Sequence, residues 1–471
     1  MSASQAVHGF LQQFQPQRLI LINEQPKFDL DLYLQNYSGR SRFDRLILIG
    51  TSCVPLCVEA LQAAVSEAMA GRDVERYIKA CQYLRSAAPD DVEGEVDQLW
   101  TQNMEIENKL ETQRLEDELK GYKNNLIKET IRMGHEDLGK HYQSIGELDK
   151  AMEAFTRMHK DVSTTKHIAD CCLHISKVAL QQRDWQVVLT NANKMSAGQG
   201  SSEESAIQAK SNILCGVALM CLGQYVDAAQ HFLQVSVQPS ASEYSDLISP
   251  SDIATYGGLT ALATMDRRQL QQRVLESLSF RSFLEHEVHI RKAINFFING
   301  RYPSCLSTLE SVRSDLLLDI YLQEHVQHLF SKIRSKCIQQ YFIPYSNVTI
   351  QSLEAAFGRP DHDIESELAT MIGQKSLKAR IDTKKKLLFA ESKDARQQMQ
   401  AEALETAQQY EKEAKERLRR INLIAAGLQV TSDGMDQAIE SVGLVAGQSW
   451  QQHDDDLYNH PINASAASVS F

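Results

Sequence analysis

The chain contains 471 residues, of which 43% are hydrophobic and 23% are charged, and its formal net charge is −12. This length exceeds a single ordinary hydrophobic core, so we expect two or three structural units. No run of about 18 apolar residues occurs, so no membrane span is predicted. The acidic balance argues against a general nucleic-acid binder, because such proteins turn a basic face toward the phosphates.

The N-terminal sequence and the cysteines indicate where the protein works. The opening residues, MSASQAVHGFLQQFQ, lack the basic segment and apolar core of a secretory signal. The nine cysteines lie mostly in apolar helical patterns, which predicts reduced thiols and a place in the nucleus and cytoplasm. Cys53 and Cys57 are four residues apart, but no second Cys or His pair completes a zinc site. We therefore expect no metal and no other cofactor.

The first part of the chain, residues 1–94, is assigned to an N-terminal arm. Over Phe28 to Leu61, helical pieces mix with a short apolar run, RLILIG. The loop-like sequence AAPDDVEGE closes the arm. From Glu95 to Lys128, Pro is absent and Gly is rare, while Glu, Lys, Leu and Gln abound, which predicts one or two long helices.

A spacing then recurs, first in GKHYQSIGELDKAMEAF. A small residue is followed by a bulky one, a turn residue, a second small residue and a second large one. The clearest copies are Gly139, Tyr142, Gly146, Ala151 and Phe155; Gly216, Leu219, Gly223, Ala228 and Phe232; and Ala293, Phe296, Gly300, Cys305 and Leu309.

Looser copies place the turn residue at Arg183 and at Asp266, so the turn positions 146, 183, 223, 266 and 300 are 37, 40, 43 and 34 residues apart. This period is typical of paired-helix solenoids. Small residues let two antiparallel helices approach, and the turn between them often needs Gly. One pair cannot cover its apolar faces, so units stack into an extended arm. We predict TPR-like repeats over residues 95–336; the alternative is a set of unrelated helical hairpins that share a period by chance.

After the repeats, the pattern changes to that of a winged helix. NVTIQSLEAAF predicts a short helix with Thr349 as its N-cap, and DHDIESELATMIGQ predicts a second helix capped by Asp361 or Asp363. LKARIDTKKKLLFAES alternates twice around a turn, which predicts a β-hairpin. Helix, turn, helix and hairpin make a winged-helix subdomain over residues 337–391. We expect the last strand of this hairpin to be a sheet edge that pairs with a neighbouring protein.

A long helix is predicted over residues 392–430. Its apolar residues step by three and four, which makes a seam about 43 Å long for a partner helix. The seam comprises Met399, Ala403, Ala407, Tyr410, Ala414, Leu418, Ile421, Ala425 and Leu428. The remaining residues, 431–471, contain no Lys or Arg and several Asp and Glu, so we expect an acidic, disordered tail.

A search for chemistry finds no catalytic constellation. His286 and His289, like His325 and His328, are three apart on predicted helices, but neither pair forms H-E-x-x-H or has a recognisable third ligand. No phosphate-binding Gly-rich loop with Lys and no G-x-S-x-G motif occurs. We therefore predict that the chain is not an enzyme.

The winged helix raises the question of nucleic acid. Residues 345–391 contain as many acidic as basic residues, and the second helix, which would enter a major groove, carries Asp363, Glu365 and Glu367. These carboxylates would be repelled by phosphates, so nucleic acid is not expected as a partner.

Repeats followed by a winged helix and a terminal helix resemble the PCI-domain family, shared by the proteasome lid, the COP9 signalosome and a translation initiation factor. Four segments are similar to the signalosome members: FDLDLYLQNYSGRSRFDRLILIG, NLIKETIRMGHEDLGKHY, LISPSDIATYGGLTALATMDR and LLLDIYLQEHV. The resemblance covers roughly residues 29–430, and YSGRSRFDR favours the signalosome over the proteasome lid. The fold class is thus expected to be all-α: a TPR-like solenoid, a winged-helix PCI subdomain and a long C-terminal helix.

The resemblance implies a non-catalytic scaffold in a complex that removes a ubiquitin-like modifier from cullin-RING ligases (deneddylation), with a zinc metalloprotease in a different subunit. It implies other PCI and metalloprotease-type subunits as partners, cullin-RING ligases as partners of the arm, and no membrane. The contact residues would be Ile381, Leu387, Leu388 and Phe389 in the wing, and Tyr410, Leu418, Ile421, Ala425 and Leu428 in the last helix. The alternatives are a PCI subunit of the proteasome lid and a winged-helix nucleic-acid binder.

Overall fold

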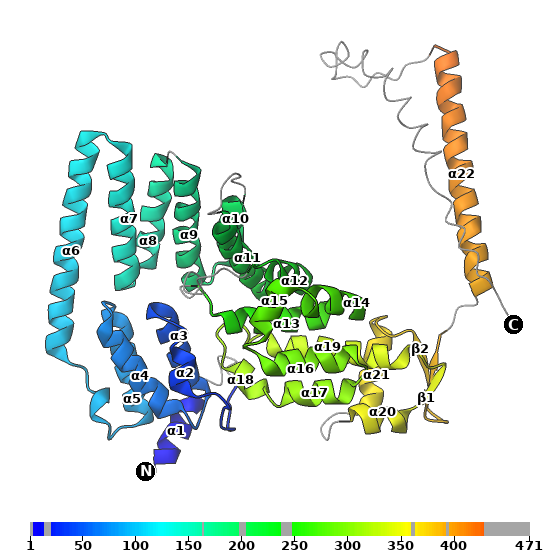
Figure 1. The fold of residues 1–471 in the computed structure, drawn as a ribbon, viewed down its shortest axis with the longest axis horizontal. Coiled ribbons are helices and arrows are strands. Elements are labelled where there is room, and N and C mark those ends of the chain that lie inside the picture. The colour runs from blue at the N-terminus through cyan, green and yellow to red at the C-terminus, as the bar shows by residue number, and fades with distance from the viewer. Residues whose placement is uncertain are drawn as a thin grey trace. The chain divides into compact units, whose positions relative to one another are not determined.

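The computed structural model describes residues 3–13, 20–162, 164–196, 204–236, 247–358, 363–391 and 395–427. The chain divides into two compact units, Met1–Ala390 and Glu391–Phe471 (Figure 1). The acidic tail, residues 431–471, and Leu428 of the expected seam lie outside the described residues. Among the described residues, no helix has the length and apolar character needed to cross a membrane.

The N-terminal arm is built from short helices around a buried core. Helix α3 contains the apolar run RLILIG, whose Leu46 and Ile49 are fully buried. The arm touches the first repeats, since Arg40 donates to the main-chain oxygen of Gln143 at 3.1 Å. The arm helices are α1 (Ala3–Gln12), α2 (Leu30–Leu34), α3 (Gly39–Ser52), α4 (Cys57–Ala70) and α5 (Val74–Ala87).

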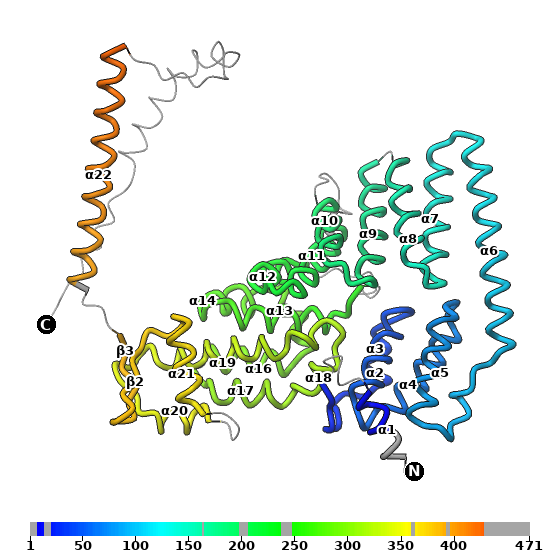
Figure 2. The backbone as a smooth tube through the Cα atoms, turned by 180° about the vertical axis from the view of Figure 1, so that it is seen from behind, coloured from blue at the N-terminus to red at the C-terminus, as the bar shows by residue number. Residues whose placement is uncertain are grey.

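The repeats follow as antiparallel helices packed side by side, which the tube in Figure 2 traces from behind. A single 28-residue helix, α6, opens them. The first set is α6 (Gln98–Asn125), α7 (Lys128–Ile145), α8 (Leu148–Met158), α9 (Thr165–Gln182), α10 (Trp185–Ser196), α11 (Glu204–Cys221) and α12 (Tyr225–Leu233). The second set is α13 (Pro250–Thr264), α14 (Arg267–Gln269), a π-helical turn (Leu270–Leu275), α15 (Leu278–Leu284), α16 (Val288–Ile298), α17 (Tyr302–Glu310), α18 (Arg313–Leu317) and α19 (Val326–Phe342).

The recurring small residues lie where two helices approach most closely. A Cβ placed on Gly139 would lie 2.6 Å from the ring of Phe155, and one on Gly216 would lie 2.8 Å from the ring of Phe232. Tyr142, Ala151, Ala228 and both aromatic rings are buried between the helices. The small–bulky spacing therefore reflects one repeated contact: an aromatic ring of the second helix of a pair packs against a glycine of the first helix.

The turn residues adopt left-handed backbone conformations at four of the five positions. Their φ angles are +96° at Gly146, +61° at Arg183, +80° at Gly223 and +75° at Gly300. Asp266 also lies between two helices, α13 and α14, as predicted, but its φ is −70° and it is the N-cap residue of α14. Its backbone N–H donates to Gln269 Oε1 at 3.3 Å, so a helix cap takes the place of a left-handed residue at this turn.

The winged helix continues the core of the repeats. Thr349 caps α20 by accepting from the N–H of Ser352, and Asp363 caps α21 by accepting from that of Glu365. Arg334 of α19 ties both helices to the repeats, because it donates to Glu367 at 2.8 Å and to the main-chain oxygen of Phe357 at 2.7 Å. The elements are β1 (Asn347–Thr349), α20 (Ile350–Phe357), α21 (Ile364–Gly373), β2 (Ala379–Asp382) and β3 (Leu387–Ala390).

The small sheet has three strands in the order β1-β3-β2, all antiparallel. The predicted hairpin is β2–β3, and β1 is a further strand that the sequence pattern does not indicate. The predicted sheet edge is wrong: β3 is the central strand, with Leu388 opposite Val348 on one side and Ile381 on the other. The free edges belong to β1 and β2.

The second unit contains the 31-residue helix α22 (Ala395–Ala425). Taken by itself, this helix is exposed along its length, including its apolar residues.

Candidate assembly site

Three of the four segments that carry the family resemblance meet at one buried charge network. Arg45 of α3 is fully buried, and its guanidinium donates to Asp319 Oδ2 at 2.7 Å and to Asp252 Oδ2 at 3.0 Å. These partners lie 274 and 207 residues further along the chain. The network joins the arm to the start of α13 and to the turn after α18.

Tyrosines complete the network. Tyr37 donates to Asp252 at 2.8 Å, and Tyr256 donates to Asp319 at 2.7 Å. Arg45 also bonds to Tyr33, and its guanidinium carbon lies 3.9 Å from the ring centroid of Tyr37. The oxygens of both carboxylates are thereby occupied, which a buried charge requires.

The pKa shifts follow from burial and from the mixture of charges. Burial alone would lower the pKa of Arg45, but the nearby carboxylates raise it well above its usual value, so the guanidinium stays charged. Burial raises the pKa of Asp252, with the charge of Arg45 opposing that shift. Burial likewise raises the pKa of Tyr37 and Tyr256, so both phenols remain donors. This cluster fixes the arm on the repeats.

The wing residues named from the sequence do not form one surface. Leu388 is fully buried and packs in the core, so its assignment as a partner contact is wrong. Ile381 and Leu387 are half-buried, and Phe389 keeps 36% of its surface exposed. A central strand alternates its side chains between the core and the outer face, which separates Leu388 from its two neighbours.

The acidic face of α21 is paired within the winged helix. Glu367 is bound by Arg334, and Glu365 forms an ion pair with Lys386 at the wing tip. The helix that would enter a DNA groove therefore presents carboxylates that hold the subdomain together, and one lysine of the wing tip is already engaged.

The seam residues of α22 lie on the surface of that helix. Tyr410 is 75% exposed, Leu418 59% and Ile421 58%, and Ala425 is exposed as well. The spacing by three and four residues places them along one side of the helix. Together they form an exposed apolar row along α22.

The histidine and cysteine pairs considered from the sequence do not converge. His325 bonds to the hydroxyl of Tyr225 at 3.0 Å, while His286 and His289 are exposed. Cys53 and Cys57 are buried free thiols, and burial raises the pKa of both. Within the described residues, no three His, Cys, Asp or Glu side chains are grouped to hold a metal ion.

Helical repeats that run into a winged helix with a three-stranded sheet define a PCI-domain protein. A family model described as "PCI domain" matches residues 309–392, and one described as "26S proteasome subunit RPN7" matches residues 97–273. COP9 signalosome complex subunit 1 of Emericella nidulans is 44% identical over 432 residues, covering 89% of this chain and 86% of that protein. The same subunit of Arabidopsis thaliana is 33% identical over 407 residues, covering 86% and 91%.

This chain belongs to the family of COP9 signalosome complex subunit 1. The similarity to the proteasome lid is more distant: 26S proteasome non-ATPase regulatory subunit 6 of Dictyostelium discoideum is 24% identical over 298 residues, covering 61% of this chain and 76% of that protein.

Proposed function

We propose that the chain is a non-catalytic scaffold subunit of a COP9 signalosome and enters the complex through α22 and its winged helix. Its family supports the first part, and the apolar row on α22 supports the second. In the complex it would hold other PCI and metalloprotease-type subunits in place for the deneddylation of cullin-RING ligases. The zinc metalloprotease would reside in a different subunit.

The observation that carries the assembly route is the exposed row on α22. A helix of 31 residues with Leu418 and Ile421 more than half exposed is not a usual surface for a soluble chain. A partner helix could cover the row by inserting its own side chains between these residues. Free sheet edges at β1 and β2 provide the second contact, because their outer main-chain groups can pair with a neighbouring wing.

The test is the double substitution Leu418→Glu with Ile421→Glu in the full chain. Burying a leucine stabilises an interface by roughly 1.5–3 kcal/mol, and a buried unpaired carboxylate costs more. We expect the variant to stop co-purifying with the other subunits while its circular dichroism stays unchanged.

The matched control is Glu411→Ala with Glu416→Ala, which removes two ion pairs from the same helix, to Lys415 and to Arg420. Exposed pairs of this kind contribute little, so assembly should persist. Full co-purification of the leucine–isoleucine variant would contradict the proposed route.

The arm is proposed as the part that meets cullin-RING ligases, with the protein working in both nucleus and cytoplasm. Support comes from the extended repeat surface and from nine free cysteines, which suit a reducing compartment. Recovery of endogenous partners on a tagged chain separates this proposal from the proteasome-lid alternative in one experiment. Salt-dependent DNA affinity of the chain would favour the nucleic-acid alternative.

A further inference from the structure

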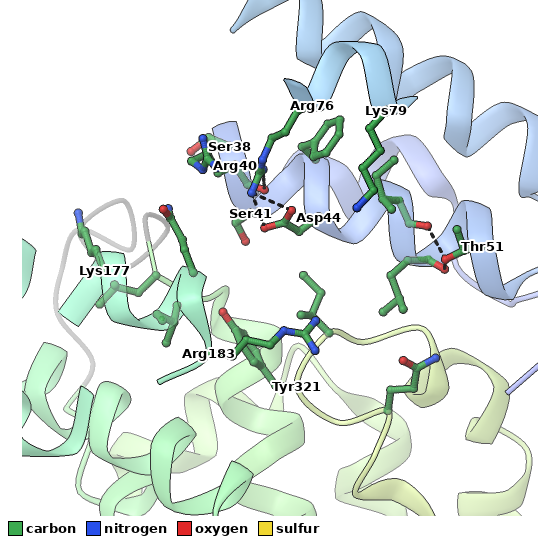
Figure 3. A pocket seen from close by; sticks show the side chains of 18 of the residues that line it. Ser38, Arg40, Ser41, Asp44, Thr51, Arg76, Lys79, Lys177, Arg183 and Tyr321 are labelled. Carbon is green, nitrogen blue, oxygen red and sulfur yellow. Dashed lines mark hydrogen bonds and ion pairs between the residues drawn. The ribbon is translucent and has the colours of Figure 1, made fainter. Parts of the chain in front are cut away.

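A half-open cavity of about 1170 Å³ lies between the arm and the first repeats (Figure 3). The arm contributes residues of α3 and α5, the repeats contribute residues of α7 and α9, and residues of the stretch 320–327 line it as well. Six cationic side chains line it, against the two carboxylates Asp44 and Glu324. These are Arg40, Arg76, Lys79, Lys140, Lys177 and Arg183.

Several of these charges are already neutralised. Arg40 pairs with Asp73 at 2.7 Å, Arg76 with Asp44 at 3.1 Å, and Lys140 with Glu136 at 2.6 Å. Lys79 and Arg183 have no carboxylate partner among the described residues. In Figure 3, Lys79 comes from the arm and Arg183 from the end of α9, so the two cations belong to different walls.

Arg183 has a left-handed backbone conformation, which glycine adopts more readily than arginine. It sits at the turn of its helix pair with φ +61°, where three other pairs have glycine. Residues with a side chain rarely adopt this conformation, and glycine adopts it freely. Glycine would form this turn without strain. Arginine at this position places a guanidinium at the cavity. Leu126, Lys375 and Lys386 adopt the same conformation and do not line this cavity, so the place of the guanidinium at the cavity wall, and not the backbone conformation, suits Arg183 to binding.

The other lining groups indicate the kind of ligand. The hydroxyl groups of Ser38 and Ser41 also line the cavity, and they can donate to a peptide carbonyl or accept from its N–H. Apolar side chains such as Phe43 and Leu180 also line the cavity, and apolar residues of a peptide could cover them.

We propose that this cavity binds an acidic, partly apolar peptide segment of a partner protein, with Lys79 and Arg183 receiving its carboxylates. This goes beyond the assembly route through α22 and uses none of its residues.

The test uses the full chain and a fluorescein-labelled short peptide of Glu, Leu and Phe, with a counterpart in which Gln replaces every Glu. Fluorescence anisotropy should show saturable binding of the acidic peptide that weakens between about 0.05 M and about 0.2 M salt, because screening shortens the reach of the charges. Equal binding of the two peptides would overturn the proposal. So would binding of inorganic tripolyphosphate without binding of the acidic peptide.

The decisive variant is Arg183→Gly, which removes the cation and relieves the turn. We expect acidic-peptide affinity to fall by about tenfold, as for the loss of one close charge pair, while the Tm stays equal or rises. Lys79→Gln, on the opposite wall, should weaken binding in the same way. Lys120→Gln is the control, because this exposed lysine of α6 pairs with Asp117 outside the cavity and should leave affinity unchanged. Unchanged affinity in both Arg183→Gly and Lys79→Gln would refute the proposal.

Discussion

Gly139 shows how a single missing Cβ can set the spacing of two helices. In an exposed helix, Gly→Ala usually stabilises a protein by up to about 1 kcal/mol, because alanine restricts the unfolded chain. At Gly139 the added methyl group would collide with the ring of Phe155, which is fully buried. We expect Gly139→Ala to destabilise the chain by about 1–3 kcal/mol, measured by urea unfolding.

The matched control is Gly121→Ala on α6, where nothing lies within 4 Å of the added Cβ. It should be neutral or slightly stabilising. If both substitutions shifted the unfolding midpoint equally, the close approach of α7 and α8 would not depend on glycine.

His174 makes the first repeats sensitive to acid. Its ring stacks on Phe155, with 5.0 Å between centroids, and burial, aided by the charge of Lys140, lowers its pKa to about 4. A histidine whose folded-state pKa is depressed contributes its full stability above the unfolded pKa of about 6.5, and this is lost as the pH falls toward about 4. We expect about 2 kcal/mol less stability at pH 5 than at pH 7 from this residue.

The check is a comparison of unfolding free energies of the wild type and His174→Phe at pH 7 and pH 5. Phenylalanine keeps a ring on Phe155 and cannot take up a proton, so the variant should lose less stability on acidification. Equal losses in the two proteins would show that other groups set the acid response.

At the scale of elements, β3 is the strand that holds the small sheet together. Because β3 is hydrogen-bonded on both sides, Leu388→Pro removes a ladder donor from the centre of the sheet and empties a fully buried position. We expect the whole winged helix, residues 347–390, to lose protection in hydrogen exchange, together with assembly. A variant that kept native protection in β1 and β2 would contradict this role for the central strand.

Local patterns made several elements predictable from the sequence. The caps Thr349 and Asp363 act through residues two or three positions away, so the sequence alone places them. Strand β1 was missed because three residues, Asn347–Thr349, are too few to show an alternating pattern. The N-cap role of Asp266 is not evident from the sequence, because aspartate both starts helices and occupies turns.

The candidate sites were predictable only in part. The apolar row of α22 is a periodic signal within one helix, whereas the Arg45 network joins residues more than 200 positions apart. The sequence does contain a weak signal of the network. Arg45 begins RLILIG and Asp319 lies inside LLLDIYL, so each is a charged residue beside an apolar run. Which distant charge each one meets is set by the stacking of the repeats, and no local pattern encodes it.

At the scale of the whole molecule, the same network ties the arm to the repeats. One continuous core runs from Val7 in α1 to Leu388 in β3, while α6 to α9 have a second core. Removing Arg45 would leave Asp252 and Asp319 buried without their cation, which typically costs about 3–5 kcal/mol. We expect Arg45→Met to destabilise the first unit as a whole, so that arm and winged helix unfold together in hydrogen exchange.

The control is Arg42→Met. Arg42 lies on α3, like Arg45, but is more exposed, and it pairs with Glu67 of α4 at 3.5 Å. This change should cost less than about 1 kcal/mol. A comparably small loss for Arg45→Met would mean that the two carboxylates find other partners.

The long sequence separation between Arg45 and its partners also determines when this contact can form during synthesis on the ribosome. Asp319 is translated 274 residues after Arg45, which at about 5–20 residues per second is a delay of roughly 14–55 seconds. Throughout that interval the nascent arm carries an arginine that has nowhere to be buried, together with apolar residues of α3 that belong to the same core. The arm is synthesised first, yet its contact with Asp319 can form only after the repeats up to that residue have been made.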